Sequence, residues 1–265
     1  GHQVTVIDSV TSSPETMTRY YKGYLIGLPL AEVAARIPPE TAIVGITVVF
    51  THEWPEIVHL IELIKQRRPE LTVIIGGEHA TAMAEFCLST SKADIVVLGE
   101  GEETIVELVD ALEAGRSLAE IDGLAFHDRD HERIIVNKRR MRMTEIDSLA
   151  PPAWDLFDLK IYHDHRYEGC MHSASLSVPI LATRGCPYQC TYCSSANMWT
   201  LRWIPRDPIK VVDEIEGYMR KYGAGNFPLQ DLTAIIKKDW IVTFCKEILR
   251  RQLKIVWQLP VGTRV

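Results

Sequence analysis

Three cysteines, Cys186, Cys190 and Cys193, lie within a stretch of eight residues that follows the apolar run 178–182. Their C-x3-C-x2-C spacing places three thiols on one short loop at the end of a predicted strand. Four thiolates normally hold an iron–sulfur cubane, but the next cysteine, Cys245, lies far along the chain on a predicted buried helix face. The loop therefore predicts a cluster with one iron left open for a substrate or cofactor.

A zinc site is the competing interpretation, because C-x2-C pairs are common zinc ligands. A structural zinc site closes with four ligands. However, no histidine or cysteine follows Cys193 within the usual distance of about 12 to 20 residues. The spacing therefore favours the iron–sulfur cluster.

The composition narrows the class of protein. The chain has 265 residues, 46% of them apolar and 24% charged, and its net charge of -6 comes without a basic stripe that would predict a nucleic-acid partner. The basic run Lys138-Arg139-Arg140, with Arg142, is interpreted as a solvated linker face. No window approaches the ~18 uninterrupted apolar residues of a membrane span. Three of the six cysteines crowd one loop, unlike a secreted disulfide framework, so we expect a reducing cytoplasm.

Both ends of the chain look cut. The sequence opens without an initiator Met, runs directly into the strand-like segment 4–8, and stops just beyond a predicted strand. We expect a piece of a longer protein that lacks the first strand of its first domain. In a flavodoxin-like order that strand lies between the second and third strands. We therefore expect a gap in the sheet and a low stability of the piece alone.

The first part of the chain alternates predicted strands and helices. Short continuous apolar runs at 42–49, 72–75 and 94–98 are typical of parallel strands buried on both faces. Helices are predicted from apolar residues at helical spacing. Their predicted inward residues are Ile57, Leu60, Ile61 and Ile64 in one helix, and Ile105, Leu108, Val109 and Leu112 in the next. This pattern predicts an α/β fold, a Rossmann-like domain of flavodoxin type over residues 1–127.

The rest of the chain divides into a connecting segment and a second α/β unit. A hairpin of 123–127 and 133–136, followed by an aperiodic surface linker, accounts for the segment 128–176. From residue 177 onward, predicted strands again alternate with predicted helices. The strands are expected at 178–183, 226–230 and 254–259, and the helices at 208–222 and 239–250. Loops at the carboxyl ends of such strands are where these folds place their chemistry.

The cysteine loop, with aromatic Tyr192 before its last thiol, resembles the cluster motif of the radical S-adenosylmethionine superfamily. The resemblance implies a [4Fe-4S] cluster on Cys186, Cys190 and Cys193, whose open iron binds S-adenosylmethionine and cleaves it to a 5′-deoxyadenosyl radical. Soft thiolates suit such low-potential clusters. The resemblance also implies that 177–265 form the N-terminal half of a partial (β/α) barrel and that Tyr192 lies near the adenine.

The same resemblance implies further contacts to S-adenosylmethionine. Asp231 lies where the superfamily places an acidic residue for the amino group, although the usual Gly-Gly-Glu form is absent. Gln258 and Arg264, at and just past the end of the last predicted strand, fit polar contacts to the ribose or carboxylate. A surface polar residue is an equally good interpretation of each of these two.

Two glycine-rich turns ahead of the cysteine loop resemble the cobalamin-binding domain of cobalamin-dependent radical S-adenosylmethionine enzymes. Each follows a predicted strand, and glycines there let the backbone approach a large flat ligand closely. An Asp-x-His-x-x-Gly motif is absent, so the lower axial ligand of cobalt stays open, and both rim histidines could equally be ordinary polar residues. The residues implied for cobalamin are Thr51, His52, Gly76, Gly77, His79, Thr81, Gly99, Gly101 and Glu102.

The resemblance implies an enzyme that acts on a small-molecule substrate with an external electron donor of flavodoxin or ferredoxin type. The expected reaction is methyl transfer to an unactivated carbon or an oxidative cyclisation. Two alternatives stay open, a cobalamin-free radical S-adenosylmethionine enzyme and a non-catalytic cobalamin or iron–sulfur binding module. A radical methylthiotransferase is disfavoured, because it would need a cysteine trio where only Cys87 is present. Since three barrel strands cannot enclose a substrate, the piece alone is not expected to be active.

Overall fold

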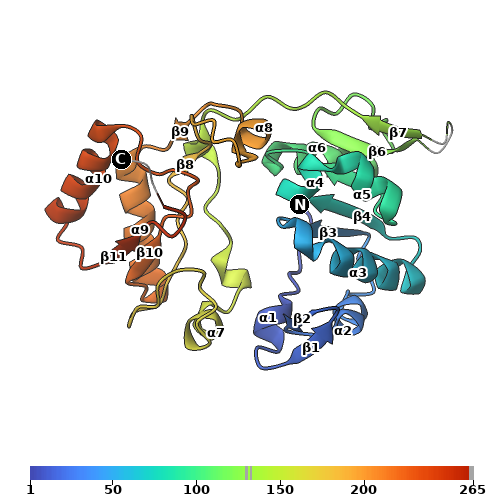
Figure 1. Ribbon diagram of the computed structural model, residues 1–265, viewed down its shortest axis with the longest axis horizontal. Coiled ribbons are helices and arrows are strands. Elements are labelled where there is room, and N and C mark those ends of the chain that lie inside the picture. The colour runs from blue at the N-terminus through green and yellow to red at the C-terminus, as the bar shows by residue number, and fades with distance from the viewer. Residues whose placement is uncertain (129–130, 132, 263–265) are drawn as a thin grey trace. The chain divides into compact units, whose positions relative to one another are not determined.

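The computed structural model describes residues 1–128, 131 and 133–262, and these residues form two compact units. Residues 15–143 form the first, which we call the sheet unit (Figure 1). Residues 1–14 and 144–265 form the second, which we call the cysteine unit. Over the described ranges, no helix is both long enough and apolar enough to cross a membrane.

A five-stranded mixed sheet in the order β3-β4-β5-β6-β7 forms the middle of the sheet unit. The first three strands are parallel, whereas the hairpin β6–β7 adds two antiparallel strands at one edge. The predicted hairpin is therefore confirmed, and it extends the sheet. The strands are β3 Ile43–Thr47, β4 Thr72–Gly76, β5 Ile95–Val97, β6 Leu124–Asp128 and β7 Arg133–Val136.

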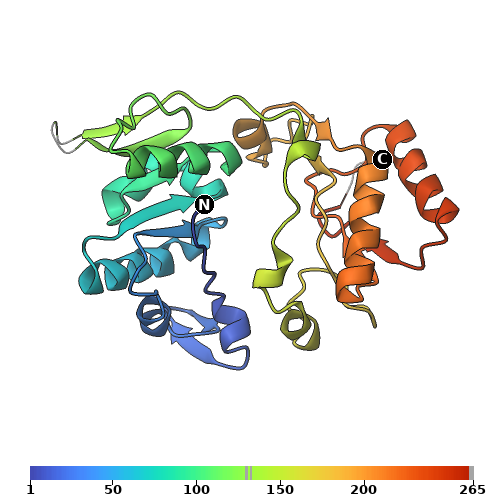
Figure 2. The same ribbon diagram turned by 180° about the vertical axis from the view of Figure 1, so that it is seen from behind.

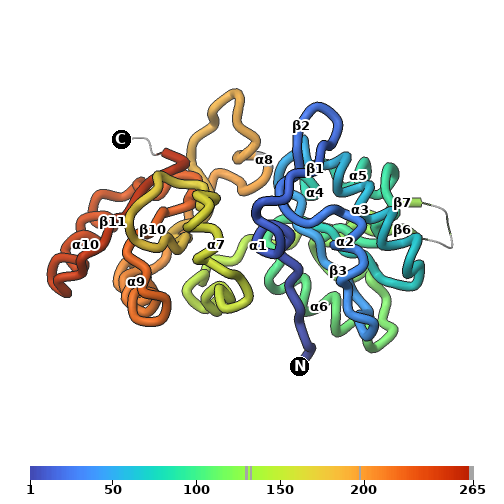
Figure 3. The backbone as a smooth tube through the Cα atoms, turned by 90° about the horizontal axis from the view of Figure 1, so that it is seen from below, coloured from blue at the N-terminus to red at the C-terminus, as the bar shows by residue number. Residues whose placement is uncertain are grey.

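Helices cover both faces of this sheet (Figures 1 and 2). Alternate strand residues enter two different cores, with Val73 and Ile75 packed on the side of α3 and α5, and Ile74 packed on the side of α6. This alternation is what a doubly wound sheet requires. A small hairpin precedes the helices in the chain (Figure 3). The elements are β1 Met17–Tyr20, β2 Gly23–Ile26, α2 Leu30–Ala35, η1 Thr51–Glu53, α3 Trp54–Arg67, α4 Glu78–Ala82, α5 Ala84–Thr90 and α6 Glu102–Glu113.

Helix α6 buries a set of residues that agrees only in part with the predicted one. Leu108 is buried as predicted, but Ile105 is 36% exposed, and Thr104 and Ala111 are buried as well. The Thr104 hydroxyl accepts a hydrogen bond from Arg140 Nε at 2.8 Å. A polar residue can therefore lie on the buried face, and an apolarity pattern alone misses it.

The start of the chain differs from the prediction. Residues 1–8 form no strand, and the short helix α1 Ser9–Ser12 follows, with the Asp8 carboxylate accepting from the backbone N–H groups of Val10 and Thr11. The predicted gap in the sheet is wrong as well, because β3 hydrogen-bonds directly to β4. β3 is an edge strand of this sheet, and it is only partly buried.

The basic run agrees only in part with its interpretation as a solvated linker face. Lys138 and Arg139 are exposed. Arg140 forms ion pairs with Glu103 and Glu107 of α6. Arg142 pairs with Glu100 at 3.3 Å, and both of these side chains are about one-tenth exposed. These two arginines are therefore bound to acidic residues that lie far from them in the sequence.

The helices α9 Pro208–Tyr222 and α10 Lys238–Arg250 lie side by side in the cysteine unit and supply much of its core (Figure 2). The strands β10 Asn226–Pro228 and β11 Val256–Gln258 pair in parallel. These four elements confirm the sequence pattern, including the end of α9 at Gly223. The remaining elements are η2 Ile146–Ser148, η3 Trp154–Leu156, α7 Leu159–Asp164, β8 Thr183–Arg184, α8 Ser195–Trp199 and β9 Ile204–Pro205.

The predicted strand 178–183 is interrupted in the structure. Val178, Ile180 and Ala182 are buried at alternate positions, as expected for an extended segment. Only single bridges join this segment to the region of β10, and regular pairing begins at β8 with β9. Pro179 has no N–H to donate, which helps to explain why the ladder is incomplete.

Gly77→Ala should strongly destabilise the sheet unit. Gly77 has a φ of +102°, and an added Cβ would lie 2.6 Å from the Val48 carbonyl oxygen. We expect the free energy of unfolding to fall by about 3 kcal/mol in chemical denaturation. Gly45→Ala on β3 is the control, because its Cβ would meet nothing within 4 Å. An equal loss in both variants would contradict this account.

Candidate functional site

The carboxyl ends of β3 and β4 bring several predicted rim residues of the sheet unit together. The carbonyl oxygen of Val48, just after β3, accepts a hydrogen bond from the His79 N–H at 3.1 Å. Gly77 lies so close to the Val48 backbone that no side chain fits between them. In η1, the Thr51 hydroxyl lies 3.1 Å from Nδ1 of His79. Thr51, Gly77 and His79 therefore form one contiguous group.

The two predicted rim histidines have different environments. His79 is 4% exposed, and its ring lies 5.4 Å from that of Trp54. Burial lowers the pKa of His79, so the neutral imidazole is favoured. Its Nε2 is buried and has no hydrogen-bond partner within the described part of the chain, which fits a ligand that supplies one. His52 is exposed and stacks on Phe50, with ring centres 5.6 Å apart.

A hydrogen bond connects the two glycine-rich turns. The Gly99 N–H donates to Thr81 Oγ1 at 2.9 Å, and Gly99 has a φ of +72°. Gly76 ends β4, whereas Gly101 lies directly before α6, and Glu102 is exposed in the first turn of that helix. The turns after β4 and β5 thus lie at the same edge of the sheet, as the sequence predicted.

Glu100 is a positioning residue of this rim that the sequence did not reveal. Its carboxylate accepts the Met143 N–H at 2.9 Å and pairs with Arg142 at 3.3 Å. These contacts fix the segment that leaves the sheet unit beside the second glycine-rich turn. The sequence contains an acidic turn at 99–102 and a basic run at 138–142, which have opposite charges. Only the structure shows that the two segments pair.

The loop of the cysteine unit carries three thiols that form no disulfide. Cys186 and Cys190 are half-buried and Cys193 is exposed, so the loop is accessible. The Ser195 N–H donates to the Cys193 sulfur at 3.4 Å. Burial raises the pKa of the thiols of Cys87, Cys170 and Cys245.

Zinc and an iron–sulfur cluster need different numbers of thiolates from this loop. A structural zinc ion needs four ligands, and the loop offers three thiols. In a cubane each thiolate binds a different iron, so three thiols suit three irons of one cluster.

Asp231 lies after β10 and contacts the segment that precedes this loop. It is 1% exposed, and its Oδ2 accepts the Ala182 N–H at 3.2 Å. Its Oδ1 is buried without a hydrogen-bond partner in the described ranges. Burial raises the pKa of Asp231 to about 6, although hydrogen bonds from Thr183 and Ala182 oppose the shift. A buried carboxylate of this kind is suited to accept a cationic amino group, which would offset the cost of its burial.

The remaining predicted residues of the cysteine unit are less directly placed. Tyr192 is 90% exposed on the loop. The Gln258 amide contacts both backbone groups of Met171, at 3.0 and 2.8 Å, and Asn226 Oδ1 at 2.9 Å, so both ends of this amide are already used. Arg264 lies outside the described residues.

Arg206 supports the segment that leads into the cysteine loop. Its guanidinium pairs with Glu214 at 2.6 Å and Asp147 at 3.0 Å. It also donates to the Leu181 carbonyl oxygen at 3.1 Å, while its own N–H bonds to the Ala182 oxygen at 3.0 Å. This positioning role of Arg206 was not predicted from the sequence.

Comparisons with known proteins identify a matching protein family and several relatives of this chain. A protein family described as the B12 binding domain matches residues 24–109, which include the rim of the sheet unit. The anaerobic magnesium-protoporphyrin IX monomethyl ester cyclase of Cereibacter sphaeroides is 36% identical over 203 residues, which are 74% of this chain and 31% of that protein. The chain thus spans about a third of the length of that relative.

Two solved structures have a similar fold. The radical S-adenosylmethionine methyltransferase TsrM from Kitasatospora setae, with cobalamin and a [4Fe-4S] cluster bound, aligns with a TM-score of 0.61 and 20% identity, covering 84% of this chain and 42% of that one. The cobalamin-dependent S-adenosylmethionine radical enzyme OxsB, with aqua-cobalamin and S-adenosylmethionine bound, aligns with a TM-score of 0.66 and 18% identity, covering 85% of this chain and 31% of that one. At these identities the likeness concerns the fold.

The buried carboxyl of Asp231 predicts a pH-dependent stability. Its folded pKa of about 6 lies above the ordinary 3.8, so ionisation favours the unfolded state, and stability falls as pH rises from the ordinary pKa to the folded one. The penalty is absent below about pH 4, grows from pH 4 to 6, and is complete above pH 6. Asp231→Asn should therefore gain about 3 kcal/mol relative to the unsubstituted chain between pH 4 and pH 7 in urea unfolding. A difference that is the same at both pH values would contradict the assignment.

Proposed function

The chain belongs to the cobalamin-binding-domain-containing radical S-adenosylmethionine enzymes, and from this premise we propose the activity of the whole protein. The cysteine unit holds a [4Fe-4S] cluster and S-adenosylmethionine, and the sheet unit holds cobalamin. When bound, these groups supply a 5′-deoxyadenosyl radical and a methyl donor or further redox centre. The observation that carries the proposal is a loop of three accessible free thiols whose preceding segment donates the Ala182 N–H to a buried, partly unsatisfied carboxylate.

In the cysteine unit, the cysteine loop and three further residues have proposed roles in binding the cluster and S-adenosylmethionine. Cys186, Cys190 and Cys193 ligate three irons, so that one iron stays open for the amino and carboxylate groups of S-adenosylmethionine. Asp231 accepts the amino group through the Oδ1 that has no partner among the described residues. Tyr192, exposed before the last thiol, lies against the adenine. Gln258 and Arg264 are proposed contacts of the ribose or carboxylate, of which Gln258 would have to release Met171.

In the sheet unit, cobalamin lies at the carboxyl ends of the parallel strands. Gly77 and Gly99 keep the backbone free of side chains where the ligand approaches. His79 offers its buried Nε2 as a hydrogen-bonding group. The other proposed contacts are Thr51, His52, Gly76, Thr81, Gly101 and Glu102.

We propose a cobalamin-binding domain at 1–127, a hairpin and linker at 128–176, and the N-terminal half of a partial (β/α) barrel at 177–265. The compact units differ from these bounds in two places, because residues 1–14 belong to the cysteine unit and the hairpin extends the sheet of the sheet unit. The parallel pairing of β10 with β11 and the helices α9 and α10 support the barrel. The protein would act in a reducing cytoplasm, with reduction of the cluster by a flavodoxin- or ferredoxin-type donor.

The substrate is a small molecule, and the reaction is a methyl transfer to an unactivated carbon or an oxidative cyclisation. Both reaction types occur among the similar proteins, as a cyclase and a methyltransferase. Anaerobic assay of the full-length protein with a reductant, followed by quantification of 5′-deoxyadenosine, tests the radical activity. Bound cofactors without any 5′-deoxyadenosine would instead support a non-catalytic binding module.

Replacing Cys186, Cys190 and Cys193 together by Ala should abolish the iron–sulfur absorption, the bound iron and 5′-deoxyadenosine formation. The reason is that no other described cysteine lies near enough in the chain to replace them. Bound cobalamin should be unchanged. Cys245→Ala is the control, since its thiol lies on α10, and it should keep the cluster. Persistence of the cluster in the triple variant would overturn the assignment.

Thr81→Val should weaken cobalamin binding without affecting the cluster. The nearly isosteric change removes the acceptor of the Gly99 N–H and frees the second glycine-rich turn. Loss of one such hydrogen bond corresponds to about tenfold weaker binding. Cobalt and iron analysis of the purified full-length protein would measure both cofactors, with Thr243→Val on α10 as the control. Unchanged cobalamin affinity would remove Thr81 from the site.

A further inference from the structure

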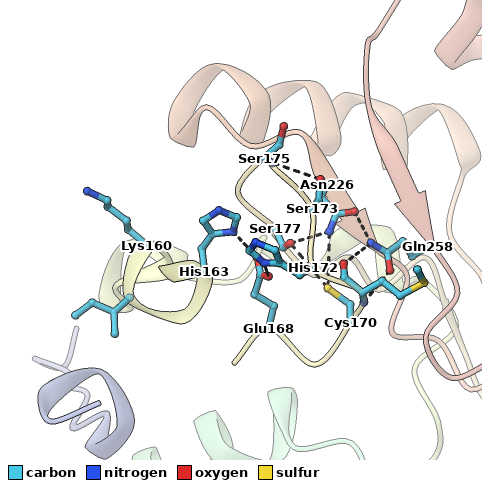
Figure 4. A network of polar contacts seen from close by, with 12 residues as sticks. Lys160, His163, Glu168, Cys170, His172, Ser173, Ser175, Ser177, Asn226 and Gln258 are labelled. Carbon is cyan, nitrogen blue, oxygen red and sulfur yellow. Dashed lines mark hydrogen bonds and ion pairs between the residues drawn. The ribbon is translucent and has the colours of Figure 1, made fainter. Parts of the chain in front are cut away.

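A cluster of two histidines and one glutamate lies in the cysteine unit, apart from the residues proposed for the three cofactors. His163 Nδ1 lies 2.9 Å from one Glu168 oxygen, and His172 Nδ1 lies 3.1 Å from the other (Figure 4). The ligand atoms of all three residues lie within 4.8 Å of one another. The two imidazole rings are stacked, with centres 4.8 Å apart.

The local backbone conformation brings the side chains of His163, Glu168 and His172 together. His163 lies near the end of α7, whose N-cap Asp158 accepts from two backbone N–H groups. The chain then reverses through Arg166 and Gly169, which have φ values of +59° and +65°. A left-handed conformation costs a residue such as Arg166 about 1 kcal/mol, so other contacts must hold the reversal. It returns Glu168 and His172 to face α7.

Glu168 is the buried member of the group. Its side chain is only 3% exposed, whereas those of His163 and His172 are 18% and 39% exposed. Burial raises its pKa, but hydrogen bonds from Ser177, His163 and His172 outweigh that effect and leave the pKa below its ordinary value. The carboxylate is therefore anionic at neutral pH, and the histidines give an ion access from the solvent.

We propose that His163, Glu168 and His172 bind a divalent transition-metal ion. Two imidazoles and one carboxylate are a ligand set that zinc and non-haem iron(II) use in proteins, with at least one coordination position left open. The set is poorer for Mg²⁺ or Ca²⁺, which prefer oxygen ligands only. The protons shared between the rings and the carboxylate would be displaced by the ion.

The ion would fix a loop that contacts the first residue of β10, Asn226, and the last residue of β11, Gln258. Glu168 forms a hydrogen bond with Ser177. The Ser177 hydroxyl also accepts a hydrogen bond at 2.7 Å from Nδ2 of Asn226. Gln258 joins Asn226 to the Met171 backbone within the same loop. Cys170 contacts Ser177 and Asn226, and we assign it no place among the ligands (Figure 4).

Titration with Co²⁺ tests the site, because cobalt replaces zinc and reports its ligands by visible absorption. The full-length protein carrying Ala at Cys186, Cys190 and Cys193 is the starting variant, so that the loop thiols cannot capture the ion. We expect about one bound Co²⁺ per chain by equilibrium dialysis, with ligand-field bands and no thiolate-to-cobalt charge transfer. His163→Ala, His172→Ala and the isosteric Glu168→Gln should each lose this ion.

His165→Ala is the matched control, because His165 lies in the same segment but stacks on Tyr167 and not on the ligand group. It should keep the ion. Added Zn²⁺ should raise the melting temperature of the starting variant and of His165→Ala, but not that of His163→Ala/His172→Ala. Metal analysis of the anaerobically prepared protein with its loop cysteines intact should find about one zinc ion per chain at this site after Zn²⁺ is added.

Two results would overturn the proposal. One is the absence of Co²⁺ binding by the starting variant, which would leave the group as hydrogen-bonded ion pairs. The other is a bound Co²⁺ that survives His163→Ala/His172→Ala or that shows a thiolate band lost in Cys170→Ser. Neither result depends on whether the protein binds S-adenosylmethionine or cobalamin.

Discussion

The position of the cysteine loop depends on the hydrogen bond from the Ala182 N–H to the buried carboxylate of Asp231. The segment before the loop has only isolated bridges to its neighbour, so it lacks the support of a regular ladder. Asp231 and Arg206 replace that support, one through the Ala182 N–H and the other through the Leu181 and Ala182 carbonyl groups. The cost of burying Asp231 is seen in its raised pKa. That cost is expected at a site where a cationic ligand completes the charge balance.

In the sheet unit, the main constraint is that side chains must be kept away from the place where a ligand would bind. Its three parallel strands end at one edge, and the backbone there turns so tightly that Gly77 touches Val48. The hydrogen bond between Thr51 and His79, and the one that Gly99 donates to Thr81, then hold the turns against one another. A rigid rim of backbone and small residues can accept a large flat cofactor without paying for loop ordering when it binds.

Much of this structure could be predicted from the sequence, because strong local patterns decided it. The helical spacing in 54–67 and 208–222 and the glycines at strand ends gave elements and turns that the structure confirms. Most of the wrong predictions concern residues whose positions depend on polar contacts between distant parts of the chain. Thr104 can be buried because Arg140 donates a hydrogen bond to its hydroxyl. Segment 4–8 forms no strand, and its last residue, Asp8, accepts a hydrogen bond from the Tyr162 hydroxyl instead. The group of His163, Glu168 and His172 depends on a chain reversal at Arg166 that no periodicity reveals.

The most direct test of the central claim is electron paramagnetic resonance of the reduced full-length protein, with and without S-adenosylmethionine. A cluster held by Cys186, Cys190 and Cys193 has an open iron, and binding of the amino and carboxylate groups to it must change the spectrum. The account predicts a [4Fe-4S] signal whose g-values shift when S-adenosylmethionine is added. A signal that stays the same at saturating S-adenosylmethionine, or no cluster signal at all, would contradict it.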